Sequence, residues 1–184
     1  MKNLLKKSII SLGLLGLIAQ VSLAQSYIYE DTSLTNNGKE AQLFVGVPVE
    51  VKKELKDKLE VVIKGYKFKN NVYSSESKEL LVATLNDGFK VVDKGGNKVE
   101  LLGKISKDTI SDDLFDVWGE QEEFYFEMCT QCHAGPQVNH HTMMEWGAIF
   151  GTMKGFAKLS EEESSYLLRY LKANSSDGFV KTEH

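Results

Sequence analysis

Five consecutive residues, Cys129-Thr130-Gln131-Cys132-His133, contain the groups that can bind a haem covalently. Their pattern is CxxCH, the attachment sequence of c-type haem. In a helix, Cys129, Cys132 and His133 would stand at positions i, i+3 and i+4 and share one face. On that face the two thiols would capture the haem vinyl groups while the imidazole ligates the iron. The sequence therefore predicts one covalently bound haem c.

The same two cysteines are also compatible with two other kinds of site. A structural zinc site needs four nitrogen or sulfur ligands, and with only two cysteines it would have to use His133, His140 or His141. His133 directly follows Cys132, which makes a shared tetrahedral geometry difficult. A thioredoxin-like dithiol would need a βαβ unit and an aromatic residue before the first cysteine, where Met128 stands. Both alternatives fit these residues less well than haem does.

The iron face opposite His133 needs its own ligand, and this ligand sets the redox potential, because a thioether favours ferrous iron more than a second imidazole does. Met153 is the preferred ligand, since it ends a predicted helix that carries Trp146 and Phe150. Together with Phe156, these rings would wall the haem pocket and exclude water. The other candidates for this position are His140, His141, Met143, Met144 and an open iron site.

Residues 1–24 have the pattern of a secretory signal peptide. Three lysines lie within the first seven residues, an apolar run covers residues 9–19, and small side chains occupy the recognition positions before a cleavage site after Ala24. Export to the periplasm would agree with covalent haem c, whose attachment takes place outside the cytoplasm. Without cleavage the segment would be a membrane anchor, although it is short for a bilayer span.

The charge balance excludes a nucleic-acid-binding function. Cleavage after Ala24 would leave 160 residues with 19 basic and 26 acidic side chains, a net charge of −7 with histidines neutral. A net negative charge more often serves solubility than the steering of a partner. The length suits one ordinary domain or two small ones.

Residues 41–105 show the period near two that is typical of strands. Val45, Val47, Val49 and Val51 alternate with other residues, and further runs cover 61–63, 80–85, 89–92 and 99–105. Turn sequences rich in Gly, Asn and Asp separate several of these runs. The pattern predicts a small antiparallel β barrel or sandwich within residues 25–110.

Helical patterns follow a polar, acidic stretch at about residues 106–116, which is expected to be a linker. One helix is predicted over residues 119–131, where it would deliver the cysteines, and another over residues 142–153. Ser160 and Glu163 form a capping-box pattern that predicts the start of a third helix, ending near Ala173.

Three helices around one haem are the plan of a class I cytochrome c. The sequence therefore predicts an α+β protein, with a β-rich domain over residues 25–110 and a monohaem cytochrome c domain of this plan over residues 111–184. In this plan the first and last helices cross. The crossing would bring Phe124 and Met128 against Leu168 and Leu171.

From Phe124 to about Ala173 the chain resembles the C-terminal monohaem domain of the TorC-type pentahaem cytochromes, which supply electrons to periplasmic trimethylamine N-oxide reductase. The resemblance implies an electron carrier of anaerobic respiration, not an enzyme, with a periplasmic molybdenum reductase as acceptor. Because the chain has a single CxxCH and lacks the family's multihaem quinol-oxidising portion, the resemblance also implies a separate membrane quinol dehydrogenase as donor. The shared residues are CTQCH, Pro136, His140, Thr142, Trp146, Met153, Phe156 and the segments 161–163 and 168–171.

Two other functions stay open at this point. The protein would be a redox sensor or partner-binding subunit if the β domain docks a partner and the haem reports redox state. It would be peroxidase-like if the iron has an open position. A shuttle that carries one electron at a time to a terminal reductase is the leading hypothesis.

Overall fold

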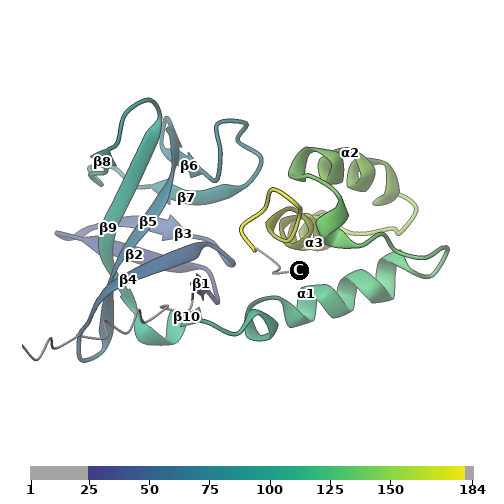
Figure 1. Ribbon diagram of the computed structural model, residues 1–184, viewed down its shortest axis with the longest axis horizontal. Helices are drawn as coiled ribbons and strands as arrows, with labels where there is room; N and C mark the ends of the chain where they lie inside the picture. The colour runs from purple at the N-terminus through teal and green to yellow at the C-terminus, as the bar shows by residue number, and fades with distance from the viewer. Residues whose placement is uncertain (1–24, 181–184) are drawn as a thin grey trace, which may run out of the picture.

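The computed structural model describes residues 25–180, so the predicted signal peptide lies outside the described residues. Strands fill the first part of this range and three α-helices the second, and Figure 1 shows them at opposite ends of the molecule. Within residues 25–180, no helix is both long enough and apolar enough to cross a bilayer. The strands are β1 (Ser26–Ile28), β2 (Thr32–Asn36), β3 (Lys39–Leu43), β4 (Pro48–Glu54), β5 (Lys58–Phe68), β6 (Asn71–Tyr73), β7 (Leu81–Leu85), β8 (Val92–Asp93), β9 (Lys98–Ser106) and β10 (Ile110–Ser111).

Six strands form a closed antiparallel barrel. Neighbouring strands pair in the order β5, β6, β7, β3, β2 and β9, and the pairing of β5 with β9 closes the ring. The eleven-residue strand β5 makes this closure possible, since it also pairs with β4 and β6 along its other edge. β1 adds to β4, and β10 adds to β1. The predicted small antiparallel barrel is therefore confirmed.

The barrel interior is filled by alternate residues of its strands. Leu34, Leu43, Ile63 and Leu101 come from four different strands and are all fully buried. A tight turn joins β2 to β3 at Asn37 and Gly38, whose φ angles of 49° and 73° match the left-handed conformation that a two-residue hairpin turn requires. The predicted runs at 61–63, 80–85 and 99–105 correspond to β5, β7 and β9, whereas β1 and β2 lie outside the predicted strand region and β3 begins two residues before it.

The helices are α1 (Leu114–Cys129), α2 (Met143–Met153) and α3 (Glu161–Ala173). Capping boxes start two of them, at Thr142 with Glu145 and at Ser160 with Glu163, so both predicted starts are confirmed. α1 begins five residues earlier than predicted, because the Asp113 carboxylate accepts a hydrogen bond from the backbone N–H of Phe115 and caps it. Part of the expected linker is therefore the start of a helix.

The predicted class I cytochrome c plan is wrong. That plan would direct the inner faces of three helices toward an enclosed haem, but here these faces are buried against one another and against the barrel side. Rings from all three helices meet in this cluster, with Tyr125 and Tyr170 centroids 6.3 Å apart. Tyr27 and Leu80, which belong to the strand-rich part, complete it. The structure is a closed barrel whose side carries three helices.

α1 and α3 pack together, and the expected residues Phe124, Leu168 and Leu171 belong to the cluster that they share. The ring of Phe124 contacts Tyr166 with centroids 6.4 Å apart, and Trp118 contacts Tyr170 with centroids 5.9 Å apart. The aromatic side chains of α3 thus contribute to this packing together with its leucines, and Leu171 is only 1% exposed.

Gly46 and Trp118 are in close contact where the barrel side meets α1. Gly46 has a φ angle of +78°, and a Cβ atom built on it would lie 1.9 Å from the Trp118 ring. Trp118 is 3% exposed. Only glycine allows the indole to lie this close to the backbone.

Arg169 fixes α3 to the barrel. Its Nε donates to the carbonyl of Val45 at 2.8 Å and its Nη1 donates to the carbonyl of Leu81 at 2.9 Å. Burial lowers the pKa of Arg169 to about 10, so the guanidinium still carries its charge at neutral pH. One turn further along α3, Lys172 forms an ion pair with Glu79 at 2.8 Å.

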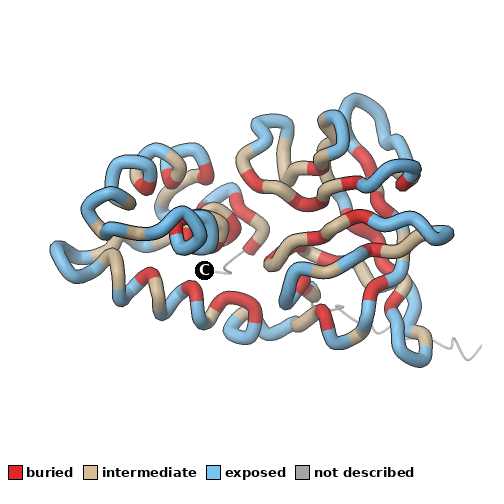
Figure 2. Tube along the Cα trace, turned by 180° about the vertical axis from the view of Figure 1, so that it is seen from behind, coloured by how far each residue is buried: buried red, intermediate tan, exposed pale blue. Residues whose placement is uncertain are grey.

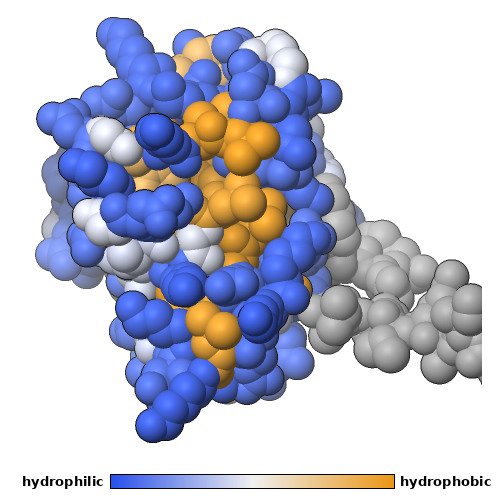
Figure 3. All heavy atoms as spheres, turned by 90° about the vertical axis from the view of Figure 1, so that its left-hand side faces the viewer, coloured by the Kyte–Doolittle hydropathy of each residue, from blue (hydrophilic) through white to orange (hydrophobic). Residues whose placement is uncertain are grey.

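Burial differs sharply between the inner and outer surfaces of the helices. Figure 2 shows buried positions along the strands and on the inward helix faces, whereas the loop after α1 is largely exposed. On the side of the barrel away from the helices, Figure 3 shows an uneven strip of hydrophobic side chains between hydrophilic ones. The exposed hydrophobic residues of the barrel include Val92 and Leu102.

Candidate haem attachment site

The CxxCH sequence lies at the C-terminal end of α1 and in the loop that follows. Cys129 is the last residue of the helix, and Thr130 caps it in a non-helical conformation. The expectation that Cys129, Cys132 and His133 share one helical face is therefore wrong. Cys129 is half-buried, Cys132 and His133 are exposed, and both thiols are free.

The two middle residues of the motif end the helix. The hydroxyl of Thr130 donates to the carbonyl of Phe126 at 2.6 Å, and the side-chain amide of Gln131 donates to the carbonyl of Glu127 at 2.8 Å. These bonds satisfy carbonyl groups that a helix terminus leaves without backbone partners. The chain consequently turns away before Cys132.

The imidazole of His133 has one nitrogen engaged and the other available. Its Nδ1 lies 2.9 Å from the carbonyl oxygen of Ala134, where an Nδ1–H group would donate. A backbone hydrogen bond at one ring nitrogen fixes the tautomer that leaves the lone pair on Nε2 for a metal. This geometry suits His133 as an iron ligand.

Two buried aromatic side chains hold the loop that follows the motif. The phenol of Tyr125 donates to the carbonyl of Pro136 at 2.7 Å, and the indole N–H of Trp146 donates to the carbonyl of Val138 at 2.7 Å. Both residues are 2% exposed, and their rings meet edge to face. A Cβ atom on Gly135 would lie 2.9 Å from the Tyr125 oxygen, so the loop comes close to the core at this point.

Tyr125 is the functional residue that the sequence did not reveal. It stands four residues before Cys129, and this spacing places the two side chains on the same face of a helix. The spacing was the signal in the sequence that could have identified Tyr125. Burial raises the pKa of Tyr125 to about 12, with a further contribution from Cys129. The phenol therefore stays protonated and donates its hydrogen bond throughout the neutral range.

Burial also raises the pKa of the Cys129 thiol. A dithiol that exchanges with disulfides needs a lowered pKa and a reactive thiolate, so this environment disfavours the thioredoxin-like alternative. The motif moreover lies between two helices and not in a βαβ unit. Among residues 25–180, no three His, Cys, Asp or Glu side chains are grouped so that they would hold a metal ion.

The residues predicted to surround the haem divide into two groups. Trp146 and Phe150 are 2% and 5% exposed, so they belong to the core that all three helices share. Met153 and Phe156 lie on the surface, and Phe156 is 80% exposed. The structure thus makes Trp146 a support of the loop and leaves Met153 and Phe156 at the surface.

The other candidates for the second iron ligand also differ in their surroundings. Met143 is buried, and its sulfur accepts a hydrogen bond from the Ser74 hydroxyl at 3.9 Å on the barrel side. His141 packs edge-on against Trp146, with centroids 5.1 Å apart. Met144 and His140 are exposed.

These features fit a haem c. Free thiols, an imidazole with Nε2 available and a firmly held loop occur in one short segment. Figure 1 places this loop and the turn after α2 at the end of the molecule away from the barrel. The exposed apolar side chains Met153 and Phe156 belong to that turn region, and a porphyrin is a large apolar group that such side chains suit.

Replacing Tyr125 by phenylalanine tests how the loop is held. The variant keeps the buried ring but loses the hydrogen bond to Pro136, so the free energy of unfolding is expected to fall by about 1–2 kcal/mol. Amide hydrogen exchange should also become faster in residues 130–138. Tyr29→Phe, which changes a half-exposed tyrosine of the barrel part, is the control and should alter neither quantity. Equal effects of the two variants would contradict a specific role for Tyr125.

Comparison with known proteins finds similarity to c-type cytochromes. It is 30% identical over 81 residues to the cytochrome c-type protein TorC of Escherichia coli O157:H7 and, to the same extent, to that of strain K12. It is 27% identical over 132 residues to the cytochrome c-type protein TorY of Escherichia coli O157:H7. The TorC matches cover 44% of this chain and the TorY match covers 64%.

These similarities relate the chain to TorC- and TorY-like cytochromes, whose c-type character implies haem c. The chain spans 21% of the length of TorC and 36% of the length of TorY. No family model matches the chain, and no solved structure matches it.

Proposed function

We propose that this protein is a periplasmic monohaem cytochrome c that carries electrons to a terminal reductase. The observation that carries the proposal is the CxxCH sequence, whose free thiols lie at the end of α1 and on the loop that Tyr125 and Trp146 hold in place. The similarity to cytochrome c-type proteins supports the same function independently.

Each residue of the site has a stated role in this proposal. Cys129 and Cys132 tether the haem through thioethers, and His133 ligates the iron through Nε2. The haem supplies one-electron chemistry, while the protein sets its potential through the ligands, burial and hydrogen bonds. The sulfur of Met153 is the proposed second ligand, and Phe156 would shield the haem from water. Trp146 and Phe150 support this end of the molecule from within the core.

The proposed acceptor is a molybdenum reductase of trimethylamine N-oxide or an S-oxide, and the proposed donor is a membrane quinol dehydrogenase. This assignment rests on the resemblance to the TorC-type cytochromes. It predicts that the reduced protein loses its ferrous absorbance when it is mixed with purified trimethylamine N-oxide reductase and trimethylamine N-oxide. A carrier must be reoxidised as fast as the reductase turns over, whereas a redox sensor would be reoxidised far more slowly. Reoxidation without the reductase would contradict the proposal.

Met153→Ala tests the second ligand. The unchanged protein is expected to show the weak near-infrared absorption band of an iron–sulfur bond, and the variant should lose it because alanine offers no ligand. The reduction potential should also fall as water or an imidazole replaces the thioether. Met144→Ala is the matched control, since Met144 is an exposed methionine of the same helix. If the band disappears in the control and persists in Met153→Ala, Met144 is the ligand.

A further inference from the structure

The outer face of α1 is rich in acidic side chains. No Lys or Arg occurs between Lys107 and Lys154, whereas this segment contains nine Asp or Glu residues. Residues 25–111, by contrast, carry 14 lysines and 13 acidic residues. The negative charge of the protein is therefore concentrated on the helices, and α1 alone has five carboxylates and no cation.

These five carboxylates are not neutralised by the surrounding protein. Among residues 25–180, none of them takes part in an ion pair. Asp116 and Glu120 accept only from the neutral hydroxyls of Ser111 and Tyr166. Like charges one turn apart on a helix repel each other, and Glu127 also lies at the unfavourable C-terminal end of the helix dipole. This clustering of negative charges therefore does not stabilise the helix.

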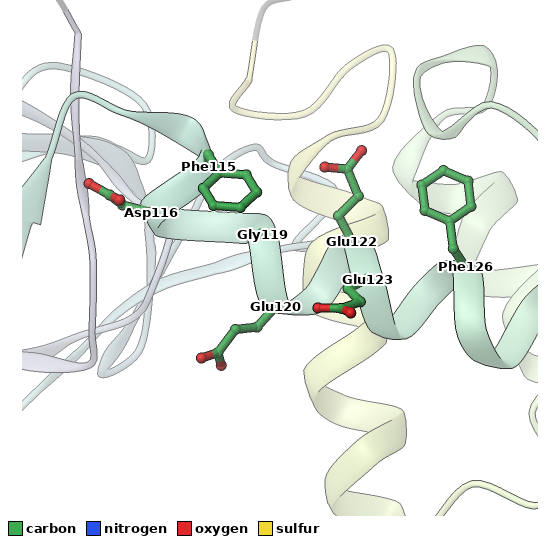
Figure 4. Close-up of a pocket in the computed structure, with 7 residues that line it drawn as sticks. All are labelled: Phe115, Asp116, Gly119, Glu120, Glu122, Glu123 and Phe126. Atoms are coloured by element: carbon green, nitrogen blue, oxygen red, sulfur yellow. The ribbon is translucent and has the colours of Figure 1, made fainter.

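Large apolar side chains lie within the same acidic face. Phe115 is 75% exposed and Phe126 is 54% exposed. They stand eleven residues apart, about three turns, so both project from one side of the helix. Gly119 lies between them and leaves a shallow depression. Figure 4 shows that all the residues lining this depression come from α1, namely Phe115, Asp116, Gly119, Glu120, Glu122, Glu123 and Phe126.

This face leads directly to the proposed haem. Phe126 precedes Cys129 by three residues, so their Cβ atoms are neighbours about 5–6 Å apart on the helix surface. A partner bound over Phe115 and Phe126 would therefore lie beside the tethered haem. Apolar contacts at the centre and charges at the rim are the usual arrangement of a protein interface.

We infer that the outer face of α1 is the docking surface for the electron acceptor, and that the acceptor presents lysines and arginines around an apolar centre. This inference rests on the proposed electron-transfer function and adds the chemistry of the partner. The unpaired carboxylates attract a basic surface over several ångströms and raise the rate of encounter, while the phenylalanines contribute contact area once the two proteins meet.

The test is the second-order rate constant for oxidation of the reduced holoprotein by purified trimethylamine N-oxide reductase. Glu120→Gln, Glu122→Gln and Glu123→Gln together should lower it about tenfold at an ionic strength of about 0.01 M. The difference should vanish at about 0.5 M, where the Debye length is only a few ångströms. Phe115→Ser should lower the rate constant at both ionic strengths, because its contribution does not depend on charge.

A matched triple variant separates this surface from net charge alone. The control variant combines Asp57→Asn, Glu76→Gln and Asp87→Asn, which remove the same charge from exposed positions on the barrel that form no ion pair among the described residues. It should change the rate constant less than about twofold. Equal losses in both triple variants, or no loss in the α1 variant, would overturn the docking surface while leaving electron transfer intact. If the reductase does not oxidise even the unchanged protein, the proposed function fails and the docking surface fails with it.

Discussion

Cys129→Ser combined with Cys132→Ser is expected to yield a protein that retains no haem after denaturation. Serine hydroxyls do not form the thioethers, so the haem would have only His133 to hold it and would be lost when the fold is disrupted. The measurements are a haem stain of the denatured polypeptide on a gel and the intact mass. The unchanged protein should be heavier than its polypeptide by one haem, and the variant should have the polypeptide mass.

The fold should survive this double substitution, because Cys132 is exposed and Cys129 is only half-buried at a helix end. Circular dichroism would verify that the helices remain. Gln137→Ser, at an exposed position of the same loop, is the control and should keep the full haem mass. An unchanged protein that leaves the periplasm colourless, with the mass of the bare polypeptide, would refute the haem assignment itself.

The contact between Gly46 and Trp118 is expected to give the largest loss of stability. Trp118→Ala should lower the free energy of unfolding by about 3–5 kcal/mol, since it removes a buried indole and leaves a cavity between the barrel and α1. Gly46→Ala should be similarly severe, because its Cβ atom would overlap the indole ring and its φ angle is positive. Urea denaturation measures both effects.

Two further variants separate the clash from the backbone strain. Gly38→Ala introduces the same strain at a φ angle of +73° but meets no atom within 4 Å, so it should cost only about 1–2 kcal/mol. In the double variant Gly46→Ala with Trp118→Ala, the indole ring is absent and cannot clash. The glycine substitution should then lower the free energy of unfolding only by this smaller amount beyond the loss caused by Trp118→Ala. Additive losses in that double variant would show that the indole and Gly46 do not interact.

The elements that the sequence predicted well are those with local signals. Ser160 and Glu163 stand at the spacing of a capping box, which depends only on neighbouring residues, and the third helix starts there. The start of α1 was missed, because the acidic stretch that contains Asp113 has the composition of a linker. The β2–β3 hairpin also had a local signal, the Asn37-Gly38 pair, which lies before the predicted strand region at residues 41–105.

The relation between the helices and the barrel was not predictable from local patterns. Trp118 and Gly46 are 72 positions apart, and nothing near either residue indicates that one covers the other. In the sequence, Tyr125 is likewise only one apolar position within an acidic segment. Its role depends on the hydrogen bond to Pro136, which the sequence does not show. The class I cytochrome plan failed for the same reason, because helix periodicity identifies an inner face without specifying what covers it.

The two carbonyl acceptors of Arg169 have a consequence for how the molecule behaves in solution. A planar guanidinium that donates in two fixed directions sets both the position and the rotation of α3, and with it the orientation of the neighbouring helices. The protein should therefore tumble as one rigid particle with its CxxCH end pointing away from the strands. A support that captures the molecule by its barrel would leave the opposite end open to collisions with other proteins.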